Sequence, residues 1–212
     1  MRISTLAEIS GVPVPTIKFY IRAGLLAAGR PTARNQAEYG EEHVTRLRLI
    51  RILTGPGRLS LAAVQRILEA LDSTGMVPGE RCRATIWALF PDASDERGAG
   101  VDRARVIVDD FVDRLGWSVD ADSPGRSALT QVLAALHRLG IACDAEVFRP
   151  YAEAAERMIA AEPVRLPAPT AEAAVARTVL LGVAFESMRL LASEHRMLND
   201  PPAAKPQAAK AS

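Results

Sequence analysis

The residues best suited to chemistry in this chain lie in TIKFYIRAGLL, the stretch 16–26. It sets two aromatic residues, Phe19 and Tyr20, between two cations, Lys18 and Arg22. On a helix, one face would carry Pro15, Lys18, Phe19 and Arg22, and the other Ile17, Ile21 and Gly24. Cations and an aromatic ring on an outward face suit nucleic acid, because amines and guanidinium groups bind phosphates and base edges. The alternative is a solvated amphipathic helix with one exposed Phe.

No catalytic or metal-binding constellation stands out elsewhere in the sequence. The histidines His43, His137 and His195 are scattered, and neither a Ser, His and Asp grouping nor a phosphate-binding glycine loop is present. Cys82 and Cys143 lie sixty-one residues apart, with no second ligand at metal-binding spacing. That spacing argues against a disulfide framework and a zinc site. We therefore expect neither enzymatic activity nor a bound cofactor or metal.

Two groups of residues beyond residue 72 allow two interpretations each. Asp109, Asp110 and Asp113 invite a metal or acid-base reading, but they alternate with apolar residues and favour a solvated helix face. A set of large apolar side chains could line a ligand pocket or simply fill the core. These residues are Trp87, Phe90, Phe111, Trp117, Phe148, Tyr151, Phe185 and Met188.

Length and composition indicate a packed globular chain of one large or two small domains, with 212 residues of which 49% are hydrophobic. Residues 1–72 carry ten Lys and Arg against six Asp and Glu, whereas the remainder carries sixteen against nineteen. A basic front and an acidic remainder are typical of a nucleic-acid-binding head with a second domain. No stretch offers about 18 uninterrupted apolar residues, so we expect a cytoplasmic protein with no membrane partner.

Helix signals at the front of the chain predict a helix-turn-helix. Thr5 and Glu8 have the spacing of a capping box, so a first helix is predicted over residues 6–11. Pro15 suits a first helical turn, where its missing N–H would have had no partner. A second helix is therefore predicted over residues 14–23.

A wing and two further helices are predicted to complete this head. Segment 27–40 contains Gly, Pro and Asn without an apolar period, which predicts a loop or a small hairpin wing. Apolar residues are dense in 41–53, and Ser60 can cap a helix that reaches Leu71. Residues 1–72 are thus predicted to form one winged helix-turn-helix unit, and the whole fold to be all-α apart from the wing.

The rest of the chain also carries helical signals. Residues 73–100 are predicted to hold a short helix at 81–90 and a linker, and residues 101–199 an all-helical effector or dimerisation domain. Its helices are predicted at 101–115, 129–139, 144–161 and 170–198. The first two end in Gly116 and Gly140, each before a large apolar residue, which is the Schellman pattern. Pro150 predicts a kink or a restart in the third, and residues 200–212 are expected to be disordered.

Several of these residues together resemble the winged helix-turn-helix domain of the MerR family of bacterial transcription regulators. The resemblance covers about residues 1–72 and rests on Gly11-Val12, residues 16–20, Gly24-Leu25-Leu26, Arg34, Tyr39 and Leu59-Ser60-Leu61. The DNA-binding residues that it implies are Thr16, Lys18, Phe19, Tyr20, Arg22, Arg30, Arg34, Asn35 and Tyr39. The wing residues among them would bind phosphates, and the others belong to the recognition helix.

The chain departs from the usual family pattern at several positions. The family usually has a cation, Arg, Tyr and an acidic residue where this chain has Pro15, Lys18, Phe19 and Ile21. Its wing usually reads Gly-Tyr-Arg-x-Tyr, and residues 35–39 here read NQAEY. The wing therefore lacks an arginine at Ala37, while Asn35 can replace Gly in a left-handed turn.

The resemblance also implies a homodimer. Family members typically follow the head with a long helix that pairs with its mate, but here helix 81–90 is short and ends before Pro91. We expect helix 170–198 to take its place, the alternative being that this helix is buried within one domain. The expected function is a one-component transcription regulator that binds a palindromic operator in double-stranded DNA, with RNA polymerase and a small organic ligand as further partners. The alternative is a ligand-free architectural or co-regulatory DNA-binding protein whose helical domain binds another protein.

Overall fold

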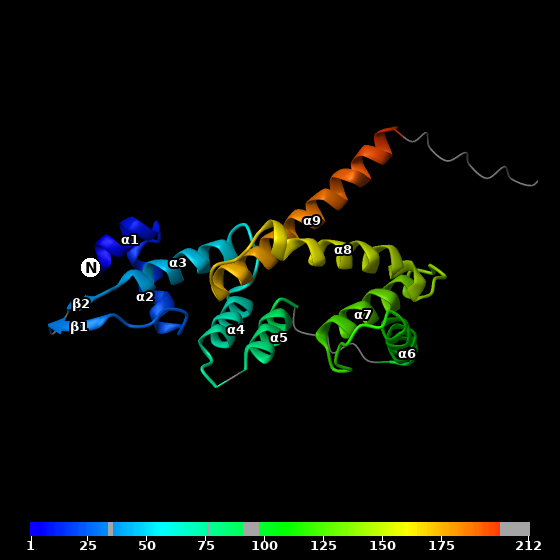
Figure 1. The fold of residues 1–212 in the computed structure, drawn as a ribbon, viewed down its shortest axis with the longest axis horizontal. Helices are drawn as coiled ribbons and strands as arrows, with labels where there is room; N and C mark the ends of the chain where they lie inside the picture. The colour runs from blue at the N-terminus through cyan, green and yellow to red at the C-terminus, as the bar shows by residue number, and fades with distance from the viewer. Residues whose placement is uncertain (34–35, 76, 91–97, 200–212) are drawn as a thin grey trace, which may run out of the picture.

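The computed structural model of the chain describes residues 1–33, 36–75, 77–90 and 98–199. These residues form a mostly helical fold with one small antiparallel sheet, as the sequence predicts (Figure 1). In chain order the elements are α1 (Ile3–Ser10), α2 (Val14–Arg22), β1 (Arg30–Ala33), β2 (Gln36–Glu38), α3 (Glu41–Thr54), α4 (Leu61–Asp72), α5 (Pro78–Ala88), α6 (Ala99–Arg114), α7 (Pro124–Arg138), the 3₁₀ turn η1 (Ala145–Phe148), α8 (Arg149–Arg165) and α9 (Ala171–Asn199).

The helix-turn-helix forms from α1 and α2, with one correction to the expected start. Helix α1 begins at Ile3, because Arg2 is already extended and provides the N-cap without a side-chain hydrogen bond. The predicted capping box at Thr5 is therefore wrong. Gly11 ends the helix with a φ of 66°, a left-handed conformation that favours glycine.

The wing is a two-stranded hairpin that leaves the head beside α2. Arg30 pairs with Glu38 and Pro31 with Ala37 across the antiparallel register. Tyr39, directly after β2, donates its backbone N–H to the carbonyl of Met1 at 2.8 Å. This bond ties the base of the wing to the segment that precedes α1.

Two clusters of buried side chains hold the head together. One lies under the helix-turn-helix and consists of Leu6, Val12, Ile17, Leu26, Tyr39, Val44 and Leu47. The second is centred on α3 and α4, and it takes Ala88 from α5 and Val175, Ala176 and Val179 from α9. A Cβ added at Gly57 would lie 2.8 Å from a methyl of Val179, so α9 packs closely on the turn after α3. The predicted domain boundary at residue 72 is therefore crossed by one continuous core.

The helices of the second part form an α6–α7 hairpin followed by two long helices. The buried cluster between α6 and α7 includes Val108, Phe111 and Leu133. Both helices end as predicted, since Gly116 and Gly140 have φ values of 73° and 77°. The 3₁₀ turn gives way to α8 at Arg149, with Pro150 in the first turn, which confirms the predicted restart. Helix α8 runs back toward the head, and the C-terminal half of α9 projects away from the body of the molecule (Figure 1).

Candidate nucleic-acid interface

The outward face of α2 presents the predicted cations and aromatic ring to solvent. Ile17 is fully buried and fixes the helix on the head core. Lys18, Phe19 and Arg22 are exposed, Phe19 to 43% of its surface. Because the helix is anchored by one face, the opposite face is free to enter a groove of DNA. This placement agrees with the helical face that the spacing predicts.

Two further residues assigned to this helix lie closer to the core. Tyr20 is half-buried, packs against both clusters of the head and lies 5.8 Å from the ring of Phe19. Thr16 is also half-buried. Tyr20 therefore helps to hold the recognition helix against the core of the head. A direct DNA contact through Thr16 or Tyr20 stays a prediction.

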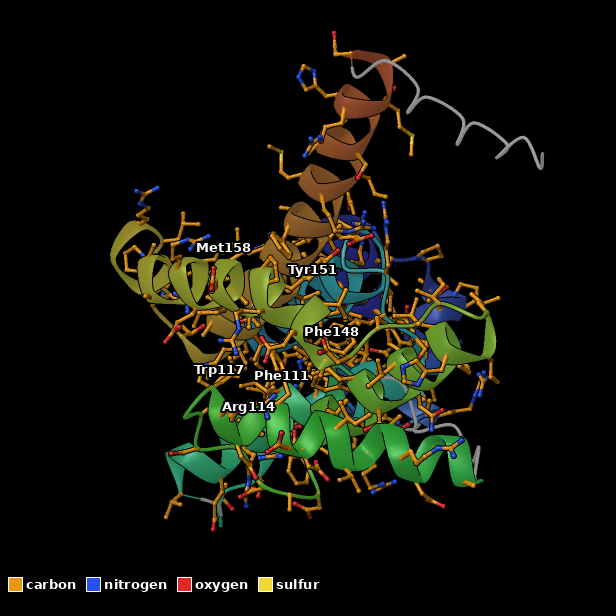
Figure 2. The ribbon with its side chains drawn as sticks, turned by 90° about the vertical axis from the view of Figure 1, so that its right-hand side faces the viewer. Phe111, Arg114, Trp117, Phe148, Tyr151 and Met158 are labelled. Carbon is orange, nitrogen blue, oxygen red and sulfur yellow. The ribbon has the colours of Figure 1, made fainter. Side chains whose placement is uncertain are left out.

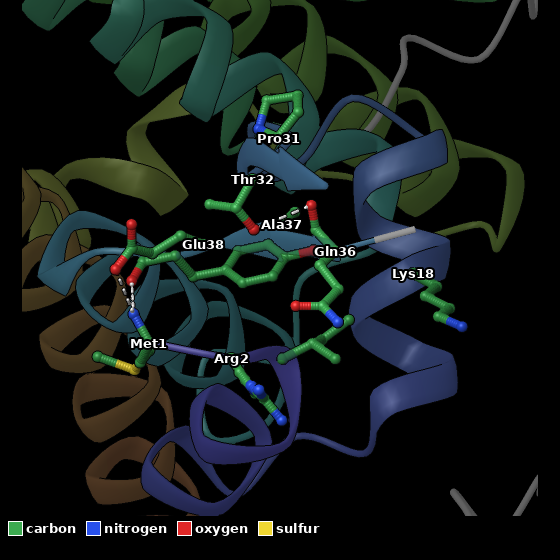
Figure 3. A pocket seen from close by; sticks show the side chains of 10 residues that line it. Met1, Arg2, Lys18, Pro31, Thr32, Gln36, Ala37 and Glu38 are labelled. Carbon is green, nitrogen blue, oxygen red and sulfur yellow. Dashed lines mark hydrogen bonds and ion pairs between the residues drawn. The ribbon is translucent and has the colours of Figure 1, made fainter. Parts of the chain in front are cut away.

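A hollow of about 680 Å³ lies between the start of the chain, α2 and the wing. Figure 3 shows Lys18 on α2 to one side of Thr32 and Gln36 of the wing, with Arg2 below them in the view. The Thr32 hydroxyl donates to the carbonyl of Gln36 at 3.3 Å. Sequence reasoning missed Arg2, whose exposed guanidinium shares this surface with Lys18.

Arg30 is the cation of the wing that lies among the described residues, and an ion pair within the protein balances its charge. Arg30 is exposed to 80% and pairs with Glu38 at 2.7 Å across the hairpin. The hydrogen bond from Arg30, assisted by the chain's amino group, holds the pKa of Glu38 below its ordinary value. The pair is therefore charged at neutral pH, and Glu38 offsets the attraction of Arg30 for a phosphate.

The other wing residues differ in their placement. Tyr39 is only 7% exposed, and its ring packs edge-on against His43 with centroids 5.1 Å apart. It therefore serves the attachment of the wing, and a phosphate contact through it stays a prediction. Arg34 and Asn35 lie outside the described residues.

A second arginine that sequence reasoning missed supports the turn between α1 and α2. Arg51 of α3 donates to the backbone carbonyl of Ser10 at 2.7 Å. A Cβ at Gly11 would lie 2.6 Å from the same guanidinium, so a larger residue there would displace the Arg51 side chain and would also have to adopt the left-handed φ of 66°. This contact ties α3 to the end of α1, directly before the turn that leads to α2.

Comparison with known proteins agrees with this geometry. The family model for MerR HTH family regulatory proteins matches residues 1–71. A solved structure described as a transcriptional regulator, SCO5550 from Streptomyces coelicolor A3(2), is 32% identical and superimposes with a TM-score of 0.67. The match covers 97% of this chain and 100% of that one. This chain belongs to the MerR family.

As a MerR-family protein, the chain is a transcription regulator with a helix-turn-helix head. No curated protein matches it closely enough to add to that assignment. Among the described residues, no helix has both the length and the hydropathy required to cross a bilayer. Nor does the same part of the chain gather three or more His, Cys, Asp or Glu side chains around a possible metal position.

Outside the head of this MerR-family chain, the predicted aromatic set divides between two apolar cavities. The first, about 660 Å³, lies between α5 and the α6–α7 hairpin and includes Trp87, Phe90 and Trp117. The second, about 610 Å³, lies between that hairpin and α8 and is lined in part by Phe111, Trp117, Phe148 and Tyr151. In Figure 2, Phe111 and Trp117 lie on the hairpin side, with Phe148 and Tyr151 opposite them.

The last two residues of that set lie on α9, apart from both cavities. Phe185 is half-buried and Met188 is 65% exposed, and neither lines one of the two cavities. The structure therefore brings six of the eight candidates to cavity walls and leaves two on the projecting helix. Whether any of them binds a ligand stays a prediction.

Proposed function

We propose that this regulator acts as a homodimer that binds a palindromic operator and responds to a small organic ligand through its C-terminal helices. The observation that carries the DNA-binding assignment is the outward face of α2, where Lys18, Phe19 and Arg22 stand beside the wing. Base edges would be read by this face, while phosphates would be held by Arg2 and by the cations of the wing.

Dimerisation is proposed to use α9. Helix α5 has 11 residues, whereas α9 has 29. Helix α9 buries apolar side chains against the head near its start, and it exposes others along its projecting half, including Leu190 at 53% and Leu191 at 57%. A two-fold axis would let these exposed side chains pack against the same residues of a second copy. A dimer of this kind places two heads on two half-sites, which is the basis of the palindrome.

Lys18 and Arg30 are expected to contribute in different ways to binding. We expect Lys18→Ala to change the order of preference among operator variants, because a side chain on the recognition helix reads base edges. Arg30→Ala should weaken binding to all sequences about equally and reduce the slope of log K against log salt by about one. Binding arrays at several salt concentrations measure both, with exposed Arg103→Ala on α6 as the control. Affinity that is independent of salt, or the reverse assignment of the two variants, contradicts the interface.

Removal of the wing carboxylate is expected to strengthen binding. Glu38→Gln frees Arg30 from its ion pair, so we expect operator affinity to rise roughly twofold to fivefold, the scale of an exposed ion pair. Glu69→Gln, an exposed carboxylate of α4, is the matched control. In the wild-type protein the same gain should appear only as the pH falls through the lowered pKa of Glu38, and the variant should not show it. Unchanged or weaker binding by Glu38→Gln would mean that the wing does not approach phosphates.

A further inference from the structure

We propose that the cleft between α5 and the α6–α7 hairpin binds an uncharged, planar aromatic molecule, and that α5 carries the effect of its occupancy to the head. This inference rests on the proposed ligand response and assigns its site, its ligand class and its route. The cleft is defined by its lining residues Cys82, Arg83, Ile86, Trp87, Phe90, Val112, Trp117, Ser118, Val119, Asp120, Ser123, Gly125, Arg126 and Leu129.

Aromatic side chains from both walls give the cleft its shape. Trp87 lies on α5 and Phe90 just beyond it, while Trp117 follows α6. Gly125, at the start of α7, allows Phe90 to come close, since a Cβ there would lie 3.3 Å from the ring. The volume of about 660 Å³ is within the range of ligand-binding pockets. Aromatic side chains in both walls favour a planar aromatic ligand, because stacked or edge-on ring pairs add to the free energy of apolar burial.

The charges around the cleft favour an uncharged ligand. Among the described residues that line it, the charged side chains are Arg83, Asp120 and Arg126. Arg83 pairs with Asp120 at 2.6 Å, and the buried Arg126 pairs with Asp113 at 2.7 Å and with Asp109 at 3.3 Å. Each charge already has a partner inside the protein. A charged ligand would lose hydration without meeting a free counter-charge, which costs binding free energy.

Helix α5 connects this cleft to the head. Trp87 faces the cleft, and the next residue, Ala88, is buried in the head core together with Leu68 and Val175. The Arg83–Asp120 ion pair joins α5 to the opposite wall. In the proposed route, a ligand that separates or draws together the walls shifts α5, and α5 passes the shift to the head core in which it is anchored. The second cavity, between the α6–α7 hairpin and α8, has no wall in α5 and provides the internal control.

The two tryptophans of the chain make the cleft directly observable. Trp87 and Trp117 both line it, and Trp117→Phe, which keeps an aromatic ring in that wall, leaves Trp87 as the single tryptophan reporter. Three probes of one shape and different charge are titrated: 2-naphthamide, 2-naphthoate and 2-naphthylmethylammonium. We expect 2-naphthamide to change Trp87 emission and to bind at least about tenfold more tightly than either ion. It should also slow alkylation of the exposed Cys82, measured with Cys143→Ser to remove the second thiol.

Two matched substitutions place the probe in one cavity or the other. Ser118→Phe adds a ring to the wall of the cleft and should abolish binding, whereas Val132→Phe adds the same ring to the second cavity and should leave binding unchanged. Both positions are exposed, so neither change disturbs a buried core. The opposite pattern, tighter binding of an ion, or no response to 2-naphthamide overturns the assignment of the cleft.

The proposed coupling of the cleft to the head through α5 is tested by a separate measurement, the affinity for the operator. Saturating 2-naphthamide should change the affinity of the wild-type protein for its selected operator by at least about fivefold, the lower end of the usual range of allosteric coupling. Ser118→Phe should bind the operator without any response to the probe. Binding in the cleft with no change in operator affinity overturns the coupling. Failure of the protein to bind any operator, with or without the probe, counts instead against the proposed function.

Discussion

A chain that ends at Gly182 is expected to be monomeric and to bind the operator roughly a hundredfold more weakly than the full chain. The expected loss is the gain from linking two heads on one DNA, since the second contact is then intramolecular. Sedimentation measures the oligomeric state, and titration with an operator and with an isolated half-site measures the affinity. The half-site should bind the shortened and the full chain about equally.

The position of this cut follows from the two different environments along α9. Val175, Ala176 and Val179 belong to the buried core of the head and must be kept. The apolar side chains after Gly182 are largely exposed, the most exposed being Met188, Leu190, Leu191, Met197 and Leu198. Large apolar side chains exposed together on one projecting helix mark an interaction surface, and a two-fold axis allows them to pack against the same residues of a second copy. A cut before Pro169 would remove the core residues as well, so it would combine loss of the dimer with loss of stability.

A point substitution tests the same surface without shortening the chain. Leu191→Glu should produce the monomer, because a carboxylate at the interface would lose hydration without a partner. Leu139→Glu is the matched control, since Leu139 is also exposed but lies at the end of α7. If the chain that ends at Gly182 still sediments as a dimer with full operator affinity, then α5 is sufficient for dimerisation and the role of α9 is refuted.

The parts of the fold that the sequence predicts well are those set by local signals. Gly116 and Gly140 each take the left-handed conformation that the Schellman pattern requires. Ser60 accepts a hydrogen bond from the N–H of Ala63 at 3.2 Å, as expected of an N-cap. The outward face of α2 is also correct, because helical periodicity alone decides which side Ile17 buries. Each of these features depends on residues within a few positions of one another.

The features that escaped prediction depend on contacts between distant segments. Asp109 and Asp113 do lie on the solvated face that the sequence favours, with 40% and 69% of their side-chain surface exposed, but their pairing with Arg126 of α7 is not visible in the sequence. Nothing in the spacing of α6 shows which residue of α7 lies opposite. Likewise, the sequence signals a boundary near residue 72 by its turn residues, but Ala88 and Val175 complete the core of the head. Turn and capping residues identify where helices end, but they do not show which helices share a core.

The aromatic candidates illustrate the same limit. The sequence could group them only by residue type, whereas the structure separates Trp87 and Phe90 from Phe148 and Tyr151 by the width of the α6–α7 hairpin. Trp117 lies at both cavities, since it follows the end of α6 where the two meet. The distinction has a functional consequence, because the first of these cavities includes a wall anchored in the head.

The second prediction with a large expected effect concerns stability, and it rests on Arg126, the buried arginine of α7. Arg126 is 8% exposed and donates to Asp113 at 2.7 Å, to the Val119 carbonyl at 3.2 Å, and to the Asp109 carboxylate and carbonyl at 3.3 Å. The hydrogen bond from Arg126 to Asp113 is the main reason why the pKa of Arg126 is raised. These bonds join α6, α7 and the loop between them, which carries Trp117.

We expect Arg126→Ala to lower the free energy of unfolding by about 2 kcal/mol, because it leaves a cavity and removes charge-assisted hydrogen bonds while the carboxylates keep part of their hydration. Arg126→Lys should recover less than half, since a single ammonium cannot reproduce the planar fork whose two terminal nitrogens meet Asp113 and Asp109 together. The exposed Arg114 gives the control, and Arg114→Ala should cost less than about 1 kcal/mol. Urea unfolding measures all three. Equal losses for Arg126→Ala and Arg114→Ala would show that the buried network adds nothing beyond a surface ion pair, and the loop that carries Trp117 would then need another support.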